Sequence, residues 1–183
     1  MTRWKDYLLR MAPPEQSRYE ALLREYLQPL RRLAWSYTRD ATEGDDLLQE
    51  IALALWTALP RFRGDSSERT WLYRVAHNTG ISYATSQKRR TAREGAAVPL
   101  EKEPTSRSNP EGEAMDREQS HRLWNAIRDL PLADRQLICL HLEGLSAAHI
   151  EDITGVNAGN VATRLTRIRQ RLVERLRGEE VRQ

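Results

Sequence analysis

The chain has 183 residues, with 29 lysines and arginines against 26 aspartates and glutamates, and a formal net charge of +3 at pH 7. This length allows two small domains, each with a modest hydrophobic core. A single cysteine excludes an internal disulfide, and the sequence shows neither a membrane-length apolar run nor an export leader, so we expect a cytoplasmic protein.

Helical periods run along the whole chain and strand-like alternation is absent, which predicts an all-α fold. After an N-terminal extension, residues 1–16, a long helix is expected from about Glu15 to Arg39, with a kink at Pro29. Thr42 is expected to cap the second helix and Pro60 to stop it. The first turns of the second helix gather acidic and amide side chains, namely Asp45, Asp46, Gln49 and Glu50.

A third helix is expected to begin near Trp71. Gly80 should interrupt it, because glycine costs a helix about 1 kcal/mol relative to alanine. A fourth helix then runs from Tyr83 to Arg90. The end of this segment carries a basic cluster suited to a polyanion, formed by Lys88, Arg89, Arg90 and Arg93. Residues 17–94 are therefore expected to form a first helical domain.

Residues 95–118 differ from the rest of the chain, because proline, serine, glutamate and glycine replace large apolar residues. Such a composition is typical of a flexible linker. A second small helical domain is expected over residues 119–178, followed by a tail at 179–183. A linker of this length allows the two domains to be either packed together or spread apart.

The C-terminal segment has the pattern of a helix-turn-helix. Ser146 can cap a short first helix, Gly155 supplies a left-handed turn, and Asn157 can cap the second helix. Apolar residues recur along the second helix at Val161, Leu165, Ile168, Leu172 and Leu176. Polar side chains that could reach DNA share one flank, at Asn160, Thr163, Arg164, Arg167 and Arg171. This spacing suits entry into the major groove, and the alternative is a helical hairpin with a solvated arginine face.

Four segments in this order resemble the extracytoplasmic-function sigma factors: DDLLQE, FRGDSSERTWLYRVAHNTGISY, LPLADRQLICLHLEGLS and the helix-turn-helix. The resemblance extends from about Tyr19 to Arg177. It implies domains of sigma region 2 and region 4 type that bind core RNA polymerase, recognise the −10 and −35 promoter elements and assist melting. It also implies an anti-sigma factor as a partner, a monomer in the holoenzyme, no membrane insertion, no cofactor and no catalytic site.

The resemblance further assigns site residues. Binding of core polymerase falls on Asp45, Asp46, Leu47, Gln49, Glu50 and Trp56. Recognition of the −10 element falls on Trp71, Asn78, Thr79, Gly80, Ser82, Tyr83, Lys88, Arg89 and Arg90, with residues 78–82 as a loop that accepts a flipped base. Recognition of the −35 element falls on His149, Asn160, Thr163, Arg164, Arg167 and Arg171.

Physical chemistry agrees with these assignments and also offers plainer readings. A carboxylate-rich helix start suits a basic partner surface, and short polar side chains beside a glycine suit an extruded base. The acids could instead only complement the helix dipole, and Trp56 and Trp71 could belong to the core.

The helix-turn-helix departs from the common family pattern. His149 stands where an acid is usual, and Glu151 stands where a small residue packs the two helices together. We therefore expect Glu151 to point outward or to tilt the first helix, and the preferred −35 hexamer to be shifted.

Two other classes of protein remain as alternatives. A helix-turn-helix regulator that acts without core polymerase would explain only the C-terminal half of the chain. An enzyme is the second alternative, with Asp45, Asp46, Glu50 and His77 as a metal-dependent nuclease site. Zinc could also be held by Cys139, His141, His121 and His149, although their spacing does not match the usual zinc motifs.

Overall fold

The computed structural model describes residues 13–38, 40–94 and 113–180, and all regular secondary structure in these ranges is helical. The elements are α2 (Pro13–Trp35), α3 (Ala41–Ala58), the short 3-10 helix η1 (Leu59–Arg61), α4 (Glu68–Glu94), α5 (Glu113–Arg128), α6 (Leu132–Leu142), α7 (Ala147–Thr154) and α8 (Ala158–Glu180). This confirms the predicted all-α fold. None of the helices in these ranges is long and apolar enough to span a membrane.

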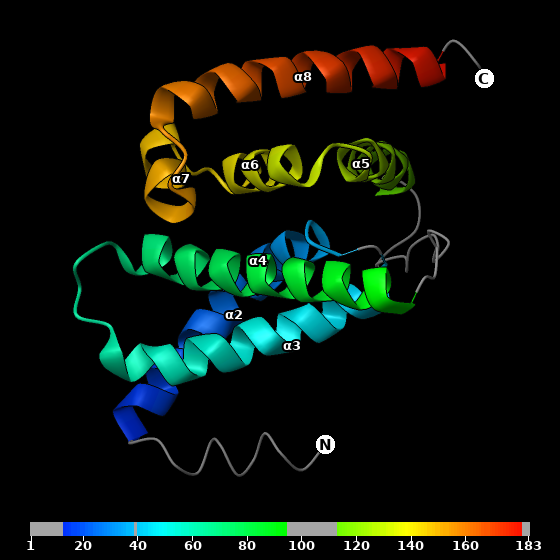
Figure 1. Ribbon diagram of the computed structural model, residues 1–183. Helices are drawn as coiled ribbons and strands as arrows, with labels where there is room; N and C mark the ends of the chain where they lie inside the picture. The colour runs from blue at the N-terminus through cyan, green and yellow to red at the C-terminus, as the bar shows by residue number, and fades with distance from the viewer. Residues whose placement is uncertain (1–12, 39, 95–112, 181–183) are drawn as a thin grey trace.

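The first domain is a bundle of α2, α3 and α4, which cross one another in the lower half of Figure 1. Their apolar stripes meet in a core that includes the fully buried Leu33, Leu47, Ile51 and Leu72. The Tyr19 hydroxyl donates a 2.9 Å hydrogen bond to the Ala52 carbonyl oxygen, which ties α2 to α3. The periodicity of the sequence predicted these faces because each helix buries residues spaced three and four apart.

The start of α3 differs from the prediction in its capping residue. Asp40, not Thr42, is the N-cap, and its carboxylate accepts a 2.8 Å hydrogen bond from the backbone N–H of Glu43. The preceding helix also ends sooner than expected, at Trp35, and continues through Pro29 before that point. The expected stop at Pro60 is confirmed, since α3 gives way to the short η1 there.

The predicted break at Gly80 is wrong, because α4 continues from Glu68 to Glu94. A side chain at position 80 would place its Cβ 2.7 Å from ring carbons of Tyr37, which is closer than carbon atoms can approach. Glycine is therefore required here for close packing of Tyr37 against α4, and not to end a helix. Residues 78–82 consequently lie on a helix surface and do not form a loop.

The second domain contains α5, α6, α7 and α8, with the long α8 lying across the other three (Figure 1). Leu140, Ile150 and Val161 are fully buried where α6, α7 and α8 meet. The helix-turn-helix is confirmed in detail: Ser146 caps α7, and Gly155 adopts a left-handed conformation with φ of 73°. Helix α5 begins at Glu113, within the segment that composition assigned to the linker.

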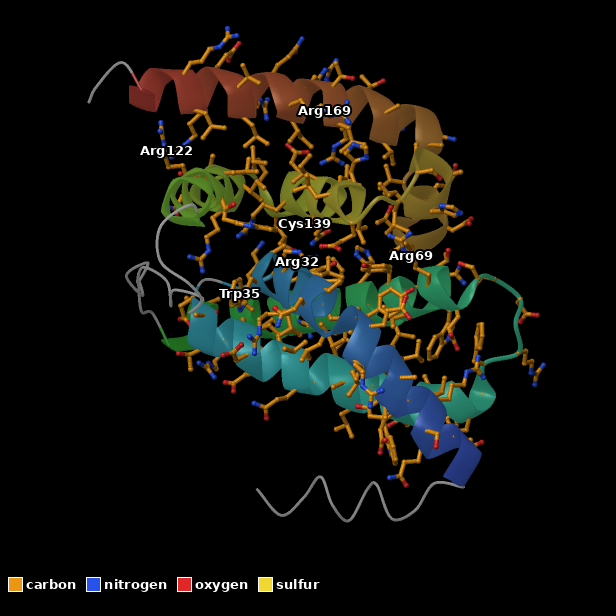
Figure 2. The ribbon with its side chains drawn as sticks, turned by 180° about the vertical axis from the view of Figure 1, so that it is seen from behind. Arg32, Trp35, Arg69, Arg122, Cys139 and Arg169 are labelled. Atoms are coloured by element: carbon orange, nitrogen blue, oxygen red, sulfur yellow. The ribbon has the colours of Figure 1, made fainter. Side chains whose placement is uncertain are left out.

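The two domains are packed against each other. Helix α4 contacts α7, α2 contacts α6, and the buried residues of both domains form one continuous cluster. Arg32 and Arg69 reach across from the first domain toward the second, and Cys139 is buried on the opposite side of the same boundary (Figure 2). Of the two arrangements that the linker allows, the structure adopts the closed one.

Candidate functional site

The first turns of α3 present an exposed acidic face. Asp45, Asp46, Gln49 and Glu50 are all exposed. Arg31 of α2 lies 3.6 Å from the Asp45 carboxylate, and partial desolvation together with the charge of Asp46 raises the pKa of Glu50. Because two of these carboxylates influence each other and none is buried, the face is suited to attract a basic partner.

Leu47 and Trp56 belong to the core and not to this face. Leu47 is 0% exposed and Trp56 is 7% exposed, with its ring packed edge-on against Tyr19 at a centroid distance of 4.8 Å. The structure therefore corrects the expectation that these two side chains offer contact surface. Their position holds α3 against α2, and so they support the acidic face indirectly.

A groove of about 590 Å³ lies between the exposed side of α3 and the first half of α4. It is lined by Glu50, Leu53, Ala54, Thr57, Ala58, Arg61, Trp71 and Thr79. Leu53 is 41% exposed, although its neighbours along α3 at Ile51 and Ala52 are buried. The groove is thus lined both by Glu50, which was assigned to polymerase binding, and by Trp71 and Thr79, which were assigned to the −10 element. Leu53 and Arg61 line the same groove and were not among the residues predicted from the sequence.

The residues assigned to the −10 element fall on both sides of α4. Asn78 and Ser82 are exposed and, four residues apart, lie on one face of the helix, while the Thr79 hydroxyl donates a 2.9 Å hydrogen bond to the Val75 carbonyl. Gly80 and Tyr83 point inward and are buried. Further along α4, Lys88, Arg89 and Arg90 are exposed and extend the polar face with positive charge.

The side chains proposed for a metal-dependent enzyme are not brought together. His77 is buried and shares a 2.6 Å hydrogen bond with the Tyr37 hydroxyl, and burial lowers the pKa of His77. The acids of α3 point to solvent instead. Within the residues that the structure describes, no group of three or more metal-ligating side chains is found.

The described candidates for a zinc site, Cys139, His141 and His149, have other surroundings. Burial raises the pKa of Cys139 to about 12, so its thiol is a poor metal ligand at neutral pH. His141 contacts Arg169 of α8, and His149 Nδ1 lies 3.0 Å from the Ser146 hydroxyl. The side chain of His121 lies outside the described residues.

The turn of the helix-turn-helix is held by two side chains. Asn157 accepts a 3.0 Å hydrogen bond from the Gly159 N–H, as predicted for a cap of α8. Glu151 does not point outward: its carboxylate accepts a 3.0 Å hydrogen bond from the Ala158 N–H, at the first residue of α8. An acid at this position of α7 therefore complements the positive end of α8 and fixes the angle between the two helices.

Helix α8 divides its polar residues between two environments. Asn160, Thr163 and Arg167 are exposed, and Arg167 has no hydrogen-bond or ion-pair partner within the described part of the chain. Arg164, by contrast, is partly buried and bonded to Asp134 of α6. Arg171 is largely exposed, with its guanidinium 3.5 Å from the second oxygen of Asp134.

Family models match both domains in the order that the sequence suggested. The model described as Sigma-70 region 2 matches residues 22–90, and the model described as Sigma-70, region 4 matches residues 120–172. The exposed acids of α3 and the polar face of α4 lie within the first match. The exposed face of α8 lies largely within the second.

Curated proteins similar to this chain include the ECF RNA polymerase sigma-E factor of Escherichia coli (strain K12). It is 32% identical over 170 residues, which cover 88% of this chain and 87% of the relative. The ECF RNA polymerase sigma-E factor of Haemophilus influenzae (strain ATCC 51907 / DSM 11121 / KW20 / Rd) is 31% identical over 154 residues, or 79% and 82% of the two chains.

Two solved structures share the fold. The sigma factor RpoE from Bartonella quintana, in complex with the anti-sigma factor NepR, superposes with a TM-score of 0.72 at 23% identity and covers 87% of this chain and 96% of its own. CnrH in complex with the cytosolic domain of CnrY has a TM-score of 0.61 at 20% identity, with coverage of 95% and 94%.

Proposed function

The chain belongs to the extracytoplasmic-function sigma factors of the sigma-70 family, and we propose which of its described surfaces bind core polymerase and which bind the −10 and −35 elements. It is an alternative sigma factor, which binds core RNA polymerase, directs it to promoters through −10 and −35 elements and assists melting. Members of this family are not enzymes in themselves. We place its action in the cytoplasm, where transcription starts.

Docking on core polymerase is assigned to the acidic face of α3. Asp46, Gln49 and Glu50 are exposed and lie on a helix fixed by Leu47 and Trp56 from below. Exposed carboxylates attract a basic partner at long range and so increase the rate of association. The same face borders the groove lined by Leu53, which adds apolar area for a partner to cover.

Reading of the −10 element is assigned to the polar face of α4. Asn78 and Ser82 offer short hydrogen-bonding side chains one turn apart, and Trp71 and Thr79 line the adjoining groove. An unstacked base can be received by aromatic and short polar groups together. The basic end of α4, at residues 88–90, is placed to hold neighbouring phosphates.

Reading of the −35 element is assigned to α8, and one observation carries the proposal. Behind a turn fixed by Asn157 and Glu151, the exposed face of α8 presents Asn160, Thr163 and Arg167, whose guanidinium has no partner among the described residues. A helix that is anchored on one side and polar on the other is the arrangement that enters a major groove. Arg171 lies one turn further and suits a phosphate contact.

An anti-sigma factor is proposed as the regulatory partner. RpoE was solved in complex with the anti-sigma factor NepR, and CnrH was solved in complex with the cytosolic domain of CnrY. The closed arrangement of the two domains gives such a partner a single body to bind.

The decisive experiment is run-off transcription with purified core polymerase and the full chain on fragments of genomic DNA from the source organism. We expect defined 5′ ends that appear only when both proteins are present, and aligned upstream sequences with two conserved elements. DNA binding by the chain alone, with no transcription and no binding to core polymerase, would instead support a helix-turn-helix regulator.

A further inference from the structure

Arg164 of α8 is held by Asp134 of α6. The Arg164 Nε and Nη2 atoms lie 3.0 Å and 2.5 Å from the same carboxylate oxygen, Asp134 Oδ1. The Asp134 side chain is only 13% exposed, and that of Arg164 is 34% exposed. Two charge-assisted hydrogen bonds at a partly buried position fix a guanidinium far more firmly than one exposed ion pair does.

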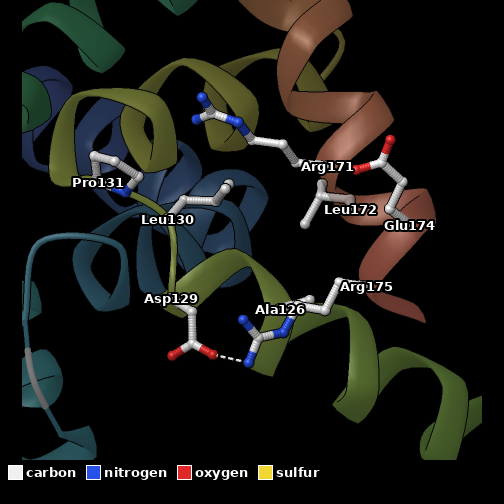
Figure 3. A pocket seen from close by; sticks show the side chains of 8 residues that line it. All are labelled: Ala126, Asp129, Leu130, Pro131, Arg171, Leu172, Glu174 and Arg175. Carbon is white, nitrogen blue, oxygen red and sulfur yellow. Dashed lines mark hydrogen bonds and ion pairs between the residues drawn. The ribbon is translucent and has the colours of Figure 1, made fainter. Parts of the chain in front are cut away.

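The second oxygen of Asp134 faces Arg171. The Arg171 Nη1 atom lies 3.5 Å from Asp134 Oδ2, but this side chain is 61% exposed. In Figure 3, Arg171 extends from α8 in a different direction from Arg175, which pairs with Asp129. Asp134 therefore binds Arg164 through two short hydrogen bonds and contacts Arg171 only at a longer distance. Of these two arginines, only Arg171 can turn toward solvent without breaking hydrogen bonds to Asp134.

Helix geometry separates Arg164 from the exposed reading face. Residue 164 lies three positions after the buried Val161 and four before the buried Ile168, which places it at the edge of the core stripe. Asn160, Thr163 and Arg167 are spaced by three and four residues from one another and share the exposed side. Arg164 thus borders the α6 side of the helix, where Asp134 meets it.

We propose that Asp134 is a positioning residue for the DNA-reading helix: it fixes Arg164 as an internal ion pair and leaves base readout to Arg167 with Asn160 and Thr163. This rests on the proposed function of α8 at the −35 element. It revises the sequence-based expectation that Arg164 itself reads a base. For Arg164 to reach DNA, the nearly buried Asp134 carboxylate would have to lose its main partner.

The proposal makes Asp134 a determinant of specificity, although it touches no DNA. With Asp134 in place, Arg167 is the arginine of the exposed face at residues 160–167 that has no hydrogen-bond or ion-pair partner in the described part of the chain, and it is left to contact the bases. Without its charge, Arg164 is released at the edge of the same helix and adds a second cation that can reach phosphates. We therefore expect loss of Asp134 to raise affinity for all sequences and to steepen the dependence on salt.

The test uses holoenzyme assembled from the full chain and core polymerase. Wild-type holoenzyme first selects promoter fragments from a pool randomised at the −35 hexamer, and the selected fragment and its single-base variants are then the probes. The variants are Arg167→Ala, Arg164→Ala, Asp134→Asn, Asp134→Glu and the double variant Asp134→Asn with Arg164→Ala. Asp129→Asn is the matched control, because it neutralises a carboxylate that pairs with another arginine of the same helix, Arg175.

We expect Arg167→Ala to reduce discrimination at one base by roughly tenfold, the usual size for loss of a guanidinium contact to a base. Arg164→Ala should change discrimination at every base by less than about twofold on the same scale. Asp134→Asn should increase the salt slope by about one, and adding Arg164→Ala should cancel that increase. Asp134→Glu and Asp129→Asn should leave discrimination and the salt slope close to the wild type.

The proposal is overturned if Arg164→Ala, with Asp134 intact, abolishes discrimination at a single base as strongly as Arg167→Ala does. It is also overturned if the salt slope of Asp134→Asn equals that of the wild type. The comparison of Arg164→Ala with Arg167→Ala remains valid even if Asp134→Asn folds poorly, because neither of these variants changes Asp134. Failure of the proposed function looks different: wild-type holoenzyme would then select no hexamer, and both proposals would fall together.

Discussion

Arg32 of α2 and Glu143 at the end of α6 form a two-bond ion pair across the boundary between the domains. The Arg32 Nε atom lies 2.7 Å from Glu143 Oε1, and Nη2 lies 2.9 Å from Oε2. The Glu143 side chain is 9% exposed, and the pairing raises the pKa of Arg32. Arg69 donates to the Glu143 carbonyl, and Arg74 donates a 3.0 Å hydrogen bond to the Asp152 carbonyl. Three arginines of the first domain therefore hold the second.

The first prediction is that Glu143→Gln opens the closed arrangement. The substitution keeps the shape but removes the charge that organises Arg32, which should weaken the interdomain contact by about 1 kcal/mol once solvent screening is allowed for. Fluorophores on the two domains should report a larger mean separation by energy transfer. Glu68→Gln is the control, because its 2.5 Å ion pair with Arg18 lies within the first domain. An unchanged separation in Glu143→Gln would show that the apolar contact alone holds the domains together.

The second prediction concerns docking on core polymerase. Asp46→Arg combined with Glu50→Arg should weaken competition for core enzyme by roughly tenfold, since two attractive charges become repulsive toward a basic partner. Helicity and melting temperature should hardly change, because both side chains are exposed. Glu174→Arg, an exposed reversal on α8, is the matched control and should compete normally. Normal competition by the double variant would exclude the acidic face of α3 as the docking surface.

The third prediction is that Asn78→Ala or Ser82→Ala changes preference at one base of the −10 element. Both residues are exposed on α4, so the fold should keep its stability within about 0.5 kcal/mol. Transcription from promoters with single-base changes in the −10 element measures the effect, and preference at the −35 hexamer serves as the internal control. A uniform loss on every promoter variant would mean that the substitution damages the domain and reads no base.

The fourth prediction is that Gly80→Ala destabilises the first domain despite the better helix propensity of alanine. The added Cβ would lie 2.7 Å from ring carbons of the buried Tyr37, and overpacking of this kind costs about 1–3 kcal/mol. The gain in propensity offsets only about 1 kcal/mol of that cost. Urea unfolding gives the comparison, with Gly159→Ala as control, where the new Cβ meets only the Asn157 side-chain oxygen at 3.2 Å. Stabilisation by Gly80→Ala would show that Tyr37 can move away at little cost.

The fifth prediction is a loss of stability in weak acid that depends on His77. Burial lowers the pKa of His77 from its ordinary value of 6.5, so the folded chain keeps this ring neutral while the unfolded chain binds a proton. The contribution is complete above about pH 6.5 and declines as the pH falls toward the folded pKa. Melting temperatures at about pH 7.5 and about pH 5.5 should differ less in His77→Gln than in the wild type. Equal pH dependence in the two proteins would rule out His77 as the source.

Local patterns in the sequence determined the helical elements and which of their side chains face solvent. The stripe from Val161 to Leu172 and the caps at Ser146 and Asn157 depend on neighbours within a few residues, and the structure confirms them. The exposure of the acids of α3 was also predictable, because the polar face of an amphipathic helix faces solvent. A family resemblance built on these segments led to the correct function class.

The tertiary structure decided what depends on distant partners. The continuity of α4 follows from Tyr37 packing on Gly80, and the pairing of Arg164 follows from Asp134, thirty positions away in the chain. The closed arrangement rests on Arg32 and Glu143, which are separated by 111 positions. Helix propensity and hydrophobic periodicity depend only on residues within one helix, so they do not specify which side chains of other helices pack against it. Which arginines of α8 form ion pairs within the protein is set by the carboxylates that folding brings beside them.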